Sequence, residues 1–381
     1  MTTSRGWRKY AVIIILLLPV LTGITFVDLI PMFYNLQLSF TNADKLSHNG
    51  RDAAHAYDYV GLSNYQKLIA QLITPDAVNS FIKLIIVLLP LIAALLIARR
   101  MTRGLLMPPD TRPVWLAGIA GTVVLWLILG GGTALNTLTQ NDFFVVVLRS
   151  ILYVVCCMPF FVIVGLALAL ILNDPRIHFK AVWRTLLIIP WAVPTFITAL
   201  IWQFFFRDAG TINLSLQALN IQDPHSPIHW LSNPILAFFA IVLVNVWMSY
   251  PFFMTIILGA LQSIPSDMYE AADVDGASYW VQLTQITIPM LRPAVAPAVI
   301  LSSISTFQMF NTVFLITGGG PINGVGKPGA TDLVMTYAYK QTFQQGNYGS
   351  IGAFAVIIFL ILLVLTLLSV RFTNITSSGA Y

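Results

Sequence analysis

Long apolar runs separated by short polar segments dominate this chain. Eight of them, at about residues 10–38, 80–98, 113–131, 143–172, 182–206, 235–261, 293–317 and 350–370, approach or exceed the length of about 20 residues that a membrane-spanning helix needs. Lipid offers no partners to open backbone groups, so the pattern predicts an all-α integral membrane protein of about eight transmembrane helices. The third run is the weakest helix, because Gly118, Gly121 and the run Gly130-Gly131-Gly132 interrupt it.

Composition agrees with a membrane protein. The chain is 57% apolar and 9% charged, whereas a soluble domain carries about 25% charged residues. The net charge of +5 is small, and the basic residues gather at the ends of the apolar runs. We therefore expect contact with membrane lipid headgroups and no nucleic-acid partner. Cys156 and Cys157 are adjacent within an apolar run, which favours packing rather than a disulfide.

Basic residues also predict the orientation. With the N-terminus in the cytoplasm, 12 of the 20 Lys and Arg residues lie on the inner side or at inner span edges. The cluster Arg99-Arg100-x-x-Arg103 is the strongest of these signals, because moving three such charges across the membrane is costly. Both termini are then cytoplasmic. The segment 39–79 is external, and residues 60–69 within it have the apolar spacing of a helix on the membrane surface.

One polar segment, between the sixth and seventh runs, concentrates acid. Glu270 is the only glutamate of the chain, and Asp267, Asp273 and Asp275 lie within nine residues of one another around it. The orientation above makes this segment cytoplasmic. A docking surface for another protein and a merely solvated connecting loop both remain open from charge alone.

Local chemistry predicts two short helices joined at a bend in this segment. Ser266 is a candidate N-cap for the first helix, and Gly276 can end it with a positive φ. Ser278 can cap the second helix, which Pro289 is expected to close before Arg292.

The spacing of this segment resembles a family signature. Glu270-Ala271-Ala272, then Gly276, then Ile286-x-Ile288-Pro289 look like the EAA motif of ABC importer permeases. Other segments resemble sugar permeases of the MalF type, namely residues 143–173, 183–202, 259–265, Thr317-Gly318-Gly319-Gly320-Pro321 and Ala330-Thr331-Asp332-Leu333.

The resemblance implies the type I permease fold of ABC importers and a role as a transport subunit in the cytoplasmic (inner) membrane. It implies five regions: 1–38 with the first span, the external loop 39–79, a two-span insertion at 80–142, a permease core at 143–371 with the EAA loop at 263–292, and a cytoplasmic tail at 372–381. It also implies a second permease, two ATPase subunits that hydrolyse the ATP, and an external solute-binding protein. The residues expected to dock on the ATPase are Glu270, Ala271, Ala272, Asp273, Asp275 and Gly276.

Polar and aromatic residues inside the spans are candidates for contact with a transported sugar. The candidates are Asn245, Trp247, Tyr250 and Phe252 on the sixth span, and Ser305, Gln308 and Asn311, spaced as a helical stripe on the seventh. Amides bond to hydroxyl groups, and aromatic faces pack on the apolar face of a sugar ring. The alternative is that these polar groups bond between helices.

Several other functions lack support in the sequence. The run 320–328 resembles a phosphate loop but has Pro321 and Pro328 where a Walker A motif needs Gly and Ser or Thr, so we expect no bound nucleotide or other cofactor. The five histidines form no metal set, and no catalytic group stands out. The rival hypothesis is an autonomous ion-coupled carrier, for which Asp28 is the one candidate membrane carboxylate. The roles of Asp28 and Arg149 stay open. The binding protein is expected at the loops 39–79, 207–234 and 318–349.

Overall fold

The computed structural model describes residues 4–44, 57–72, 74–102, 110–223, 225–322, 324 and 327–372. These residues form helices and loops, and their one strand-like pair is an isolated bridge between Thr41 and Tyr59. Two compact units divide the chain, Met1–Gln71 with Ala338–Leu363, and Leu72–Tyr337 with Val364–Tyr381. Most of the expected cytoplasmic tail, residues 45–56 of the expected external loop, and Arg103 lie outside the described residues.

Membrane-spanning helices account for most of the described chain. Six helices are long and apolar enough to cross a membrane: Ile13–Leu38, Pro75–Ala98, Asp142–Asn173, Pro234–Leu261, Tyr279–Phe307 and Tyr348–Leu367. Two further pairs pass the same test together but are sharply bent, Arg112–Ile128 with Gly131–Thr139 and Lys180–Ala192 with Thr195–Phe205. With each bent pair taken as one crossing, the described residues hold the eight crossings that the apolar runs predict.

The first unit combines the N-terminal helices with most of the last helix. Its helices are α1 (Ser4–Ile24), the π-helical turn η1 (Thr25–Leu29), α2 (Ile30–Leu38), α4 (Ser63–Leu72), the π-helical turn η3 (Lys340–Gln344) and most of α18 (Tyr348–Phe372). Asn64, on the predicted surface helix, donates to the carbonyl oxygens of Ser39 at 3.0 Å and Thr41 at 2.7 Å. The backbone N–H of Gly349 donates to the carbonyl of Ala43 at 2.9 Å. These bonds join the end of the first span to the start of the last.

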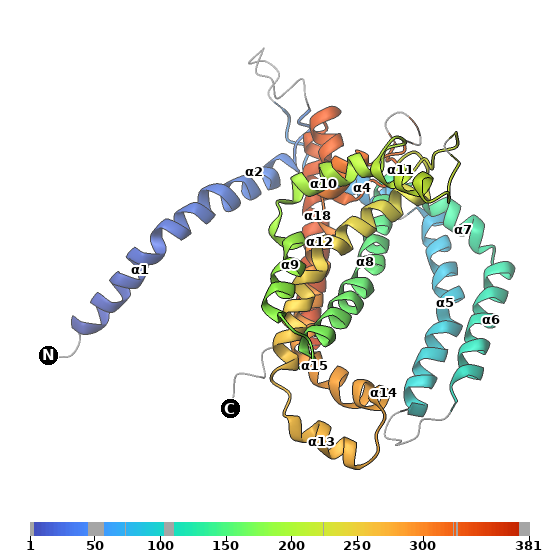
Figure 1. The fold of residues 1–381 in the computed structure, drawn as a ribbon. Coiled ribbons are helices and arrows are strands. Elements are labelled where there is room, and N and C mark those ends of the chain that lie inside the picture. The colour runs from blue at the N-terminus through green and yellow to red at the C-terminus, as the bar shows by residue number, and fades with distance from the viewer. Residues whose placement is uncertain are drawn as a thin grey trace. The chain divides into compact units, whose positions relative to one another are not determined.

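The core of the second unit forms where α8 (Asp142–Asn173) packs along α12 (Pro234–Leu261) (Figure 1). Both helices are apolar on nearly every face, so each can pack against several neighbours. Tyr153 and Phe161 of α8 and Phe253 of α12 are fully buried between them. Helices α9 (Lys180–Ala192) and α15 (Ile288–Phe307) pack on α12 as well. The pair α8 and α12 is thus the framework to which the other helices of this unit attach.

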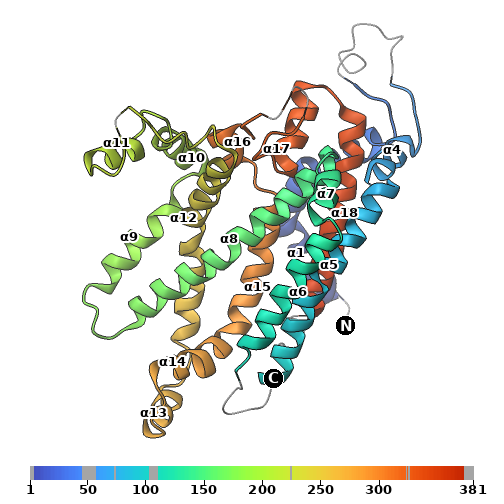
Figure 2. The ribbon, with the colours of Figure 1, turned by 90° about the vertical axis from the view of Figure 1, so that its right-hand side faces the viewer.

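A separate pair is formed by α5 (Pro75–Thr102) and α6 (Arg112–Ile128), which run side by side (Figure 2), with α7 (Gly131–Leu138) continuing from α6. The chain bends by 70° between α6 and α7. Gly130 takes φ +64° at this bend, in the left-handed region that favours glycine. The glycine run therefore ends the helix, whereas Gly118 and Gly121, which the sequence also marks as weak points, lie inside α6 without a break.

The fifth predicted span is divided into two helices. Helix α9 ends at Ala192, α10 (Thr195–Phe205) begins three residues later, and the two are bent by 88°. Val193 is extended at φ −76° and ψ 133°, because the ring of Pro194 disfavours helical backbone in the residue before it. After α10 comes the short helix α11 (Thr211–Ala218).

The seventh span also differs from its prediction. After α13 (Ser266–Val274), the helices α14 (Tyr279–Gln282), η2 (Leu283–Thr287, a π-helical turn) and α15 follow without a break. Pro289 therefore does not close a helix. The π-helical turn before it shifts the backbone hydrogen bonds, so the helix continues although proline has no N–H to donate. The span begins at Tyr279 rather than 293 and ends at Phe307, before the short α16 (Asn311–Thr317). Helices α13 and α14 lie at one end of the second unit, and α11 and α16 at the other (Figures 1 and 2).

Candidate functional site

A sharp bend joins α13 to α14, and we refer to residues 266–282 as the acidic elbow. Gly276 takes φ +70°, as the sequence predicts for a residue that ends a helix. The N–H of Ala277 donates to the carbonyl of Ala272 at 2.9 Å, and the N–H of Gly276 donates to that of Asp273 at 3.0 Å. This is the Schellman pattern, and it satisfies carbonyls that the end of a helix would otherwise leave open.

Side chains hold the elbow in one shape. The amide of Gln282 donates to the carboxylate of Asp273 at 2.6 Å and to the carbonyl of Ala277 at 3.2 Å. The hydroxyl groups of Tyr269 and Thr287 share a hydrogen bond of 2.9 Å. Tyr269 thereby ties α13 to the turn that leads directly into α15. Sequence reasoning missed Tyr269, Gln282 and Thr287, because their contacts cross the bend and follow no helical period.

The outer face of the elbow combines acids with exposed apolar side chains. Asp267, Glu270 and Asp275 are exposed, and no ion pair to them is found among the described residues. The exposed fraction is 89% for Val274 and 70% for Trp280. Aromatic and apolar groups at this exposure, beside unpaired acids, are typical of a surface that another protein covers.

Two details of the elbow refine its sequence prediction. Ser266 is the first residue of α13 rather than its cap, and Pro265 takes the capping position with no side-chain bond. Ala271 is exposed and Ala272 half-buried, so α13 has a slim outer face. Asp273 differs from the other acids of the elbow, because its carboxylate already accepts the bond from Gln282.

Asn245 does not lie on an accessible surface. Its side chain is 0% exposed, between α12 and α8. Its amide nitrogen lies 3.6 Å from the sulfur of Cys157, and its oxygen accepts from Ser249 at 3.4 Å. The position of Asn245 therefore favours the alternative of a bond between helices over contact with a sugar.

The aromatic candidates of α12 are half-buried and face the bent fifth span. Trp247 packs edge-on against Trp202, with ring centroids 5.7 Å apart. Phe252 lies 5.9 Å from Trp191 by the same measure. Tyr250 is half-buried on the same helix. The sequence did not single out Trp191 or Trp202, whose ring partners lie on another helix.

Ser305, Gln308 and Asn311 do not form one helical stripe. Helix α15 ends at Phe307, and Gln308 caps it at φ −90° and ψ 14°, so Asn311 starts a new helix in a new direction. All three side chains are exposed. Asn311 donates to the hydroxyl of Thr195 at 3.4 Å, which places the start of α16 beside the start of α10.

The loop after α16 is tightly bonded to α8. Thr331 donates to the carbonyl of Gly320 at 2.6 Å, and the N–H of Val334 donates to the hydroxyl of Ser150 at 2.9 Å. Arg149 donates to the carbonyl of Gly329. These bonds give Arg149, whose role the sequence left open, a structural function.

Comparison with known proteins agrees with this architecture. The family described as "Binding-protein-dependent transport system inner membrane component" matches residues 163–377, which is more than half of the chain. A trehalose/maltose transport system permease protein, MalF of Thermococcus litoralis, is 40% identical over 195 residues, which cover 51% of this chain and 62% of that protein. The galactooligosaccharides transport system permease protein GanP of Bacillus subtilis is 35% identical over 218 residues, covering 57% and 51%.

A solved structure supports the fold. A chain from the crystal structure of a bacterial ABC transporter involved in the import of the acidic polysaccharide alginate matches 97% of this chain and 96% of its own length, with a TM-score of 0.55 and 16% identity. At that identity the match supports the fold alone. This chain spans between about half and two thirds of the two curated relatives. With the family match over the helices that carry both the acidic elbow and the bent fifth span, the chain belongs to the inner membrane components of binding-protein-dependent transport systems.

Proposed function

We propose that this chain is the membrane-spanning permease subunit of an ATP-driven importer for a sugar or an oligosaccharide that an external binding protein delivers. The observation that carries the proposal is the acidic elbow. Its acids are exposed, its shape is held by side-chain hydrogen bonds, and it leads directly into a membrane helix. ATP is hydrolysed on separate subunits in this proposal, and two of these work with this chain and a second permease.

The bonds of the elbow suggest how a push would travel. An ATPase subunit that holds Glu270 and the apolar residues around it moves α13 as a short rigid rod. The bond between Tyr269 and Thr287 passes that movement to the base of α15. Because α15 packs on both α8 and α12, the movement reaches the framework of the unit. This role requires the orientation that the basic residues predict, in which the elbow and both termini are cytoplasmic.

The proposed path for the solute lies where the spans are broken. Trp191 and Thr195 flank the break of the fifth span, and they contact Phe252 and Asn311 respectively. Aromatic faces with a few amide and hydroxyl groups suit a sugar. Broken helices near the middle of a membrane are also where transporters bind their solutes. The named substrates of the two curated relatives, trehalose/maltose and galactooligosaccharides, support a saccharide.

A reconstituted transporter tests the proposal. The chain is produced with a second permease, an ATPase and a solute-binding protein of the same organism, and ATP hydrolysis and sugar uptake are measured in vesicles. Glu270→Gln should weaken ATPase association, because loss of one member of an interfacial charge pair costs about 2–5 kcal/mol. Asp76→Asn, which neutralises an exposed acid on α5, is the matched control and should leave association unchanged.

Two results would contradict the proposal. One is wild-type association and uptake in Glu270→Gln, which would remove the elbow from docking. The other is uptake by the purified chain alone, driven by an ion gradient with no ATPase present, which would establish the rival carrier.

A further inference from the structure

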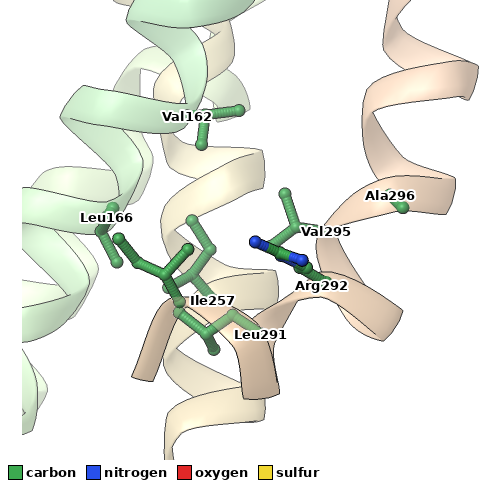
Figure 3. A pocket seen from close by; sticks show the side chains of 8 residues that line it. Val162, Leu166, Ile257, Leu291, Arg292, Val295 and Ala296 are labelled. Carbon is green, nitrogen blue, oxygen red and sulfur yellow. The ribbon is translucent and has the colours of Figure 1, made fainter. Parts of the chain in front are cut away.

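A hollow opens between α8, α12 and the start of α15 (Figure 3). Its volume is about 290 Å³. The wall includes Val162 and Leu166 of α8, Ile257 of α12, and Leu291, Arg292 and Val295 of α15. The site proposed for docking and the path proposed for the solute do not use these side chains.

The chemistry of the hollow is almost entirely hydrocarbon. Apart from Arg292, every lining residue has an aliphatic side chain, so a bound group finds no hydrogen-bond partner in the wall. A volume at the lower end of the usual range for ligand pockets, about 300–1,000 Å³, suits a single chain rather than a bulky molecule. A sugar would leave its hydroxyl groups unpaired there.

Arg292 gives the hollow a positive mouth. It lies one helical turn after the start of α15 at Ile288, and Figure 3 shows its guanidinium nitrogens turned toward the space between α15 and α12. Its side chain is exposed, and no hydrogen bond or ion pair to it is found among the described residues. A planar guanidinium near the start of α15 favours a phosphate, which it can hold with two parallel bonds.

We propose that this hollow binds one acyl chain of an anionic phospholipid, with Arg292 holding the phosphate of the headgroup. The hollow has a volume of about 290 Å³, which is too small to admit an α-helix of a partner protein that is about 10–12 Å across with its side chains. An acyl chain matches the aliphatic wall. The anionic headgroup supplies a negatively charged partner for Arg292, which has none among the described residues. Basic pockets between helices near the cytoplasmic membrane surface are known to select anionic headgroups.

Native mass spectrometry of the full-length chain, purified in detergent, tests the site. The chain is titrated with phosphatidylglycerol or with phosphatidylcholine of the same acyl chains. Wild-type protein should retain phosphatidylglycerol at about tenfold lower concentration than phosphatidylcholine. Arg292→Gln should weaken phosphatidylglycerol binding about tenfold or more, the loss expected for a bond to a charged group. Arg292→Lys should keep part of the preference.

Two further variants separate the site from general attraction to the surface. Arg176→Gln removes another exposed cation, outside the hollow, and should leave phosphatidylglycerol binding unchanged. Val295→Trp fills the hollow while Arg292 stays, and it should reduce the retention of both lipids. If Val295→Trp does not fold, Arg292→Gln alone tests the lipid site. Arg292 is exposed, so its substitution should leave folding intact.

Any of four results would overturn the proposal. Phosphatidylglycerol could bind Arg292→Gln as it binds wild-type protein, or Arg176→Gln could lose it by the same factor. Free inorganic phosphate at equal concentration could displace the lipid, which would mark a phosphate site without an acyl chain. A photoreactive group at Val295 could capture the second permease in the assembled transporter, which would assign the hollow to an interface between subunits.

Discussion

At Gly165 of α8 the two framework helices lie in close contact, and replacing this glycine with Ala should separate them. A Cβ atom at Gly165 would lie 2.7 Å from the Cβ of Phe253 and 2.9 Å from the backbone nitrogen of Met254. Both of these atoms are fixed close to the backbone of α12. No side-chain rotation can relieve such a contact, so the helices themselves must move.

Two opposing terms set the expected size of the effect. In a helix, Ala is more stable than Gly by about 0.5–1 kcal/mol. Overfilling a packed interior costs about 1–3 kcal/mol, and contact with backbone puts this site in the upper part of that range. We therefore expect Gly165→Ala to lower the free energy of unfolding by about 1–2 kcal/mol.

Gly259 on α12 offers a matched control. It is also a helical glycine, but a Cβ atom there would meet nothing within 4 Å. Gly259→Ala should therefore raise the free energy of unfolding by about 0.5–1 kcal/mol. Unfolding in mixed micelles with increasing sodium dodecyl sulfate, followed by tryptophan fluorescence, compares the three proteins. Equal stability of the two variants would refute the close approach of α8 and α12.

Three further substitutions test the site. Gln282→Ala removes the bond to Asp273 across the bend of the elbow. The free energy of unfolding should change by less than about 1 kcal/mol, because the bond is exposed, but ATP hydrolysis should become uncoupled from uptake in reconstituted vesicles. Normal coupling in this variant would show that the bond is dispensable. Asn245→Leu replaces a buried amide whose bonds are weak, so uptake should keep its KM for the sugar; a raised KM would return Asn245 to the path. Asn311→Leu should lower the rate of uptake in vesicles with assembly intact, and unchanged kinetics would exclude Asn311 from the path.

Long apolar runs predicted the number of crossings well, because a stretch of about 20 apolar residues has few alternatives in lipid. The positive φ of Gly276 was predictable for a similar reason, since a glycine directly after a helical segment has a strong local preference. In both cases the determining physics lies within the segment itself.

Errors arose where a neighbouring segment decides the outcome. The apolar run 182–206 gives the length of the fifth span but not its 88° bend at Val193-Pro194. The contact between Asn245 and Cys157 could not be foreseen, because the two residues are 88 positions apart in the chain. Pro289 stays inside a helix because of the π-helical turn before it, and no residue pattern in the sequence predicts that turn.

The bend between α9 and α10 has a consequence for hydration. The end of α9 leaves carbonyl oxygens without helical partners, and the start of α10 leaves N–H groups in the same state, within a segment of apolar sequence. Such groups cannot face acyl chains, so solvent has to reach them from inside the bundle. Water molecules at this bend would therefore be present before any solute arrives, and each transport cycle would have to expel and readmit them.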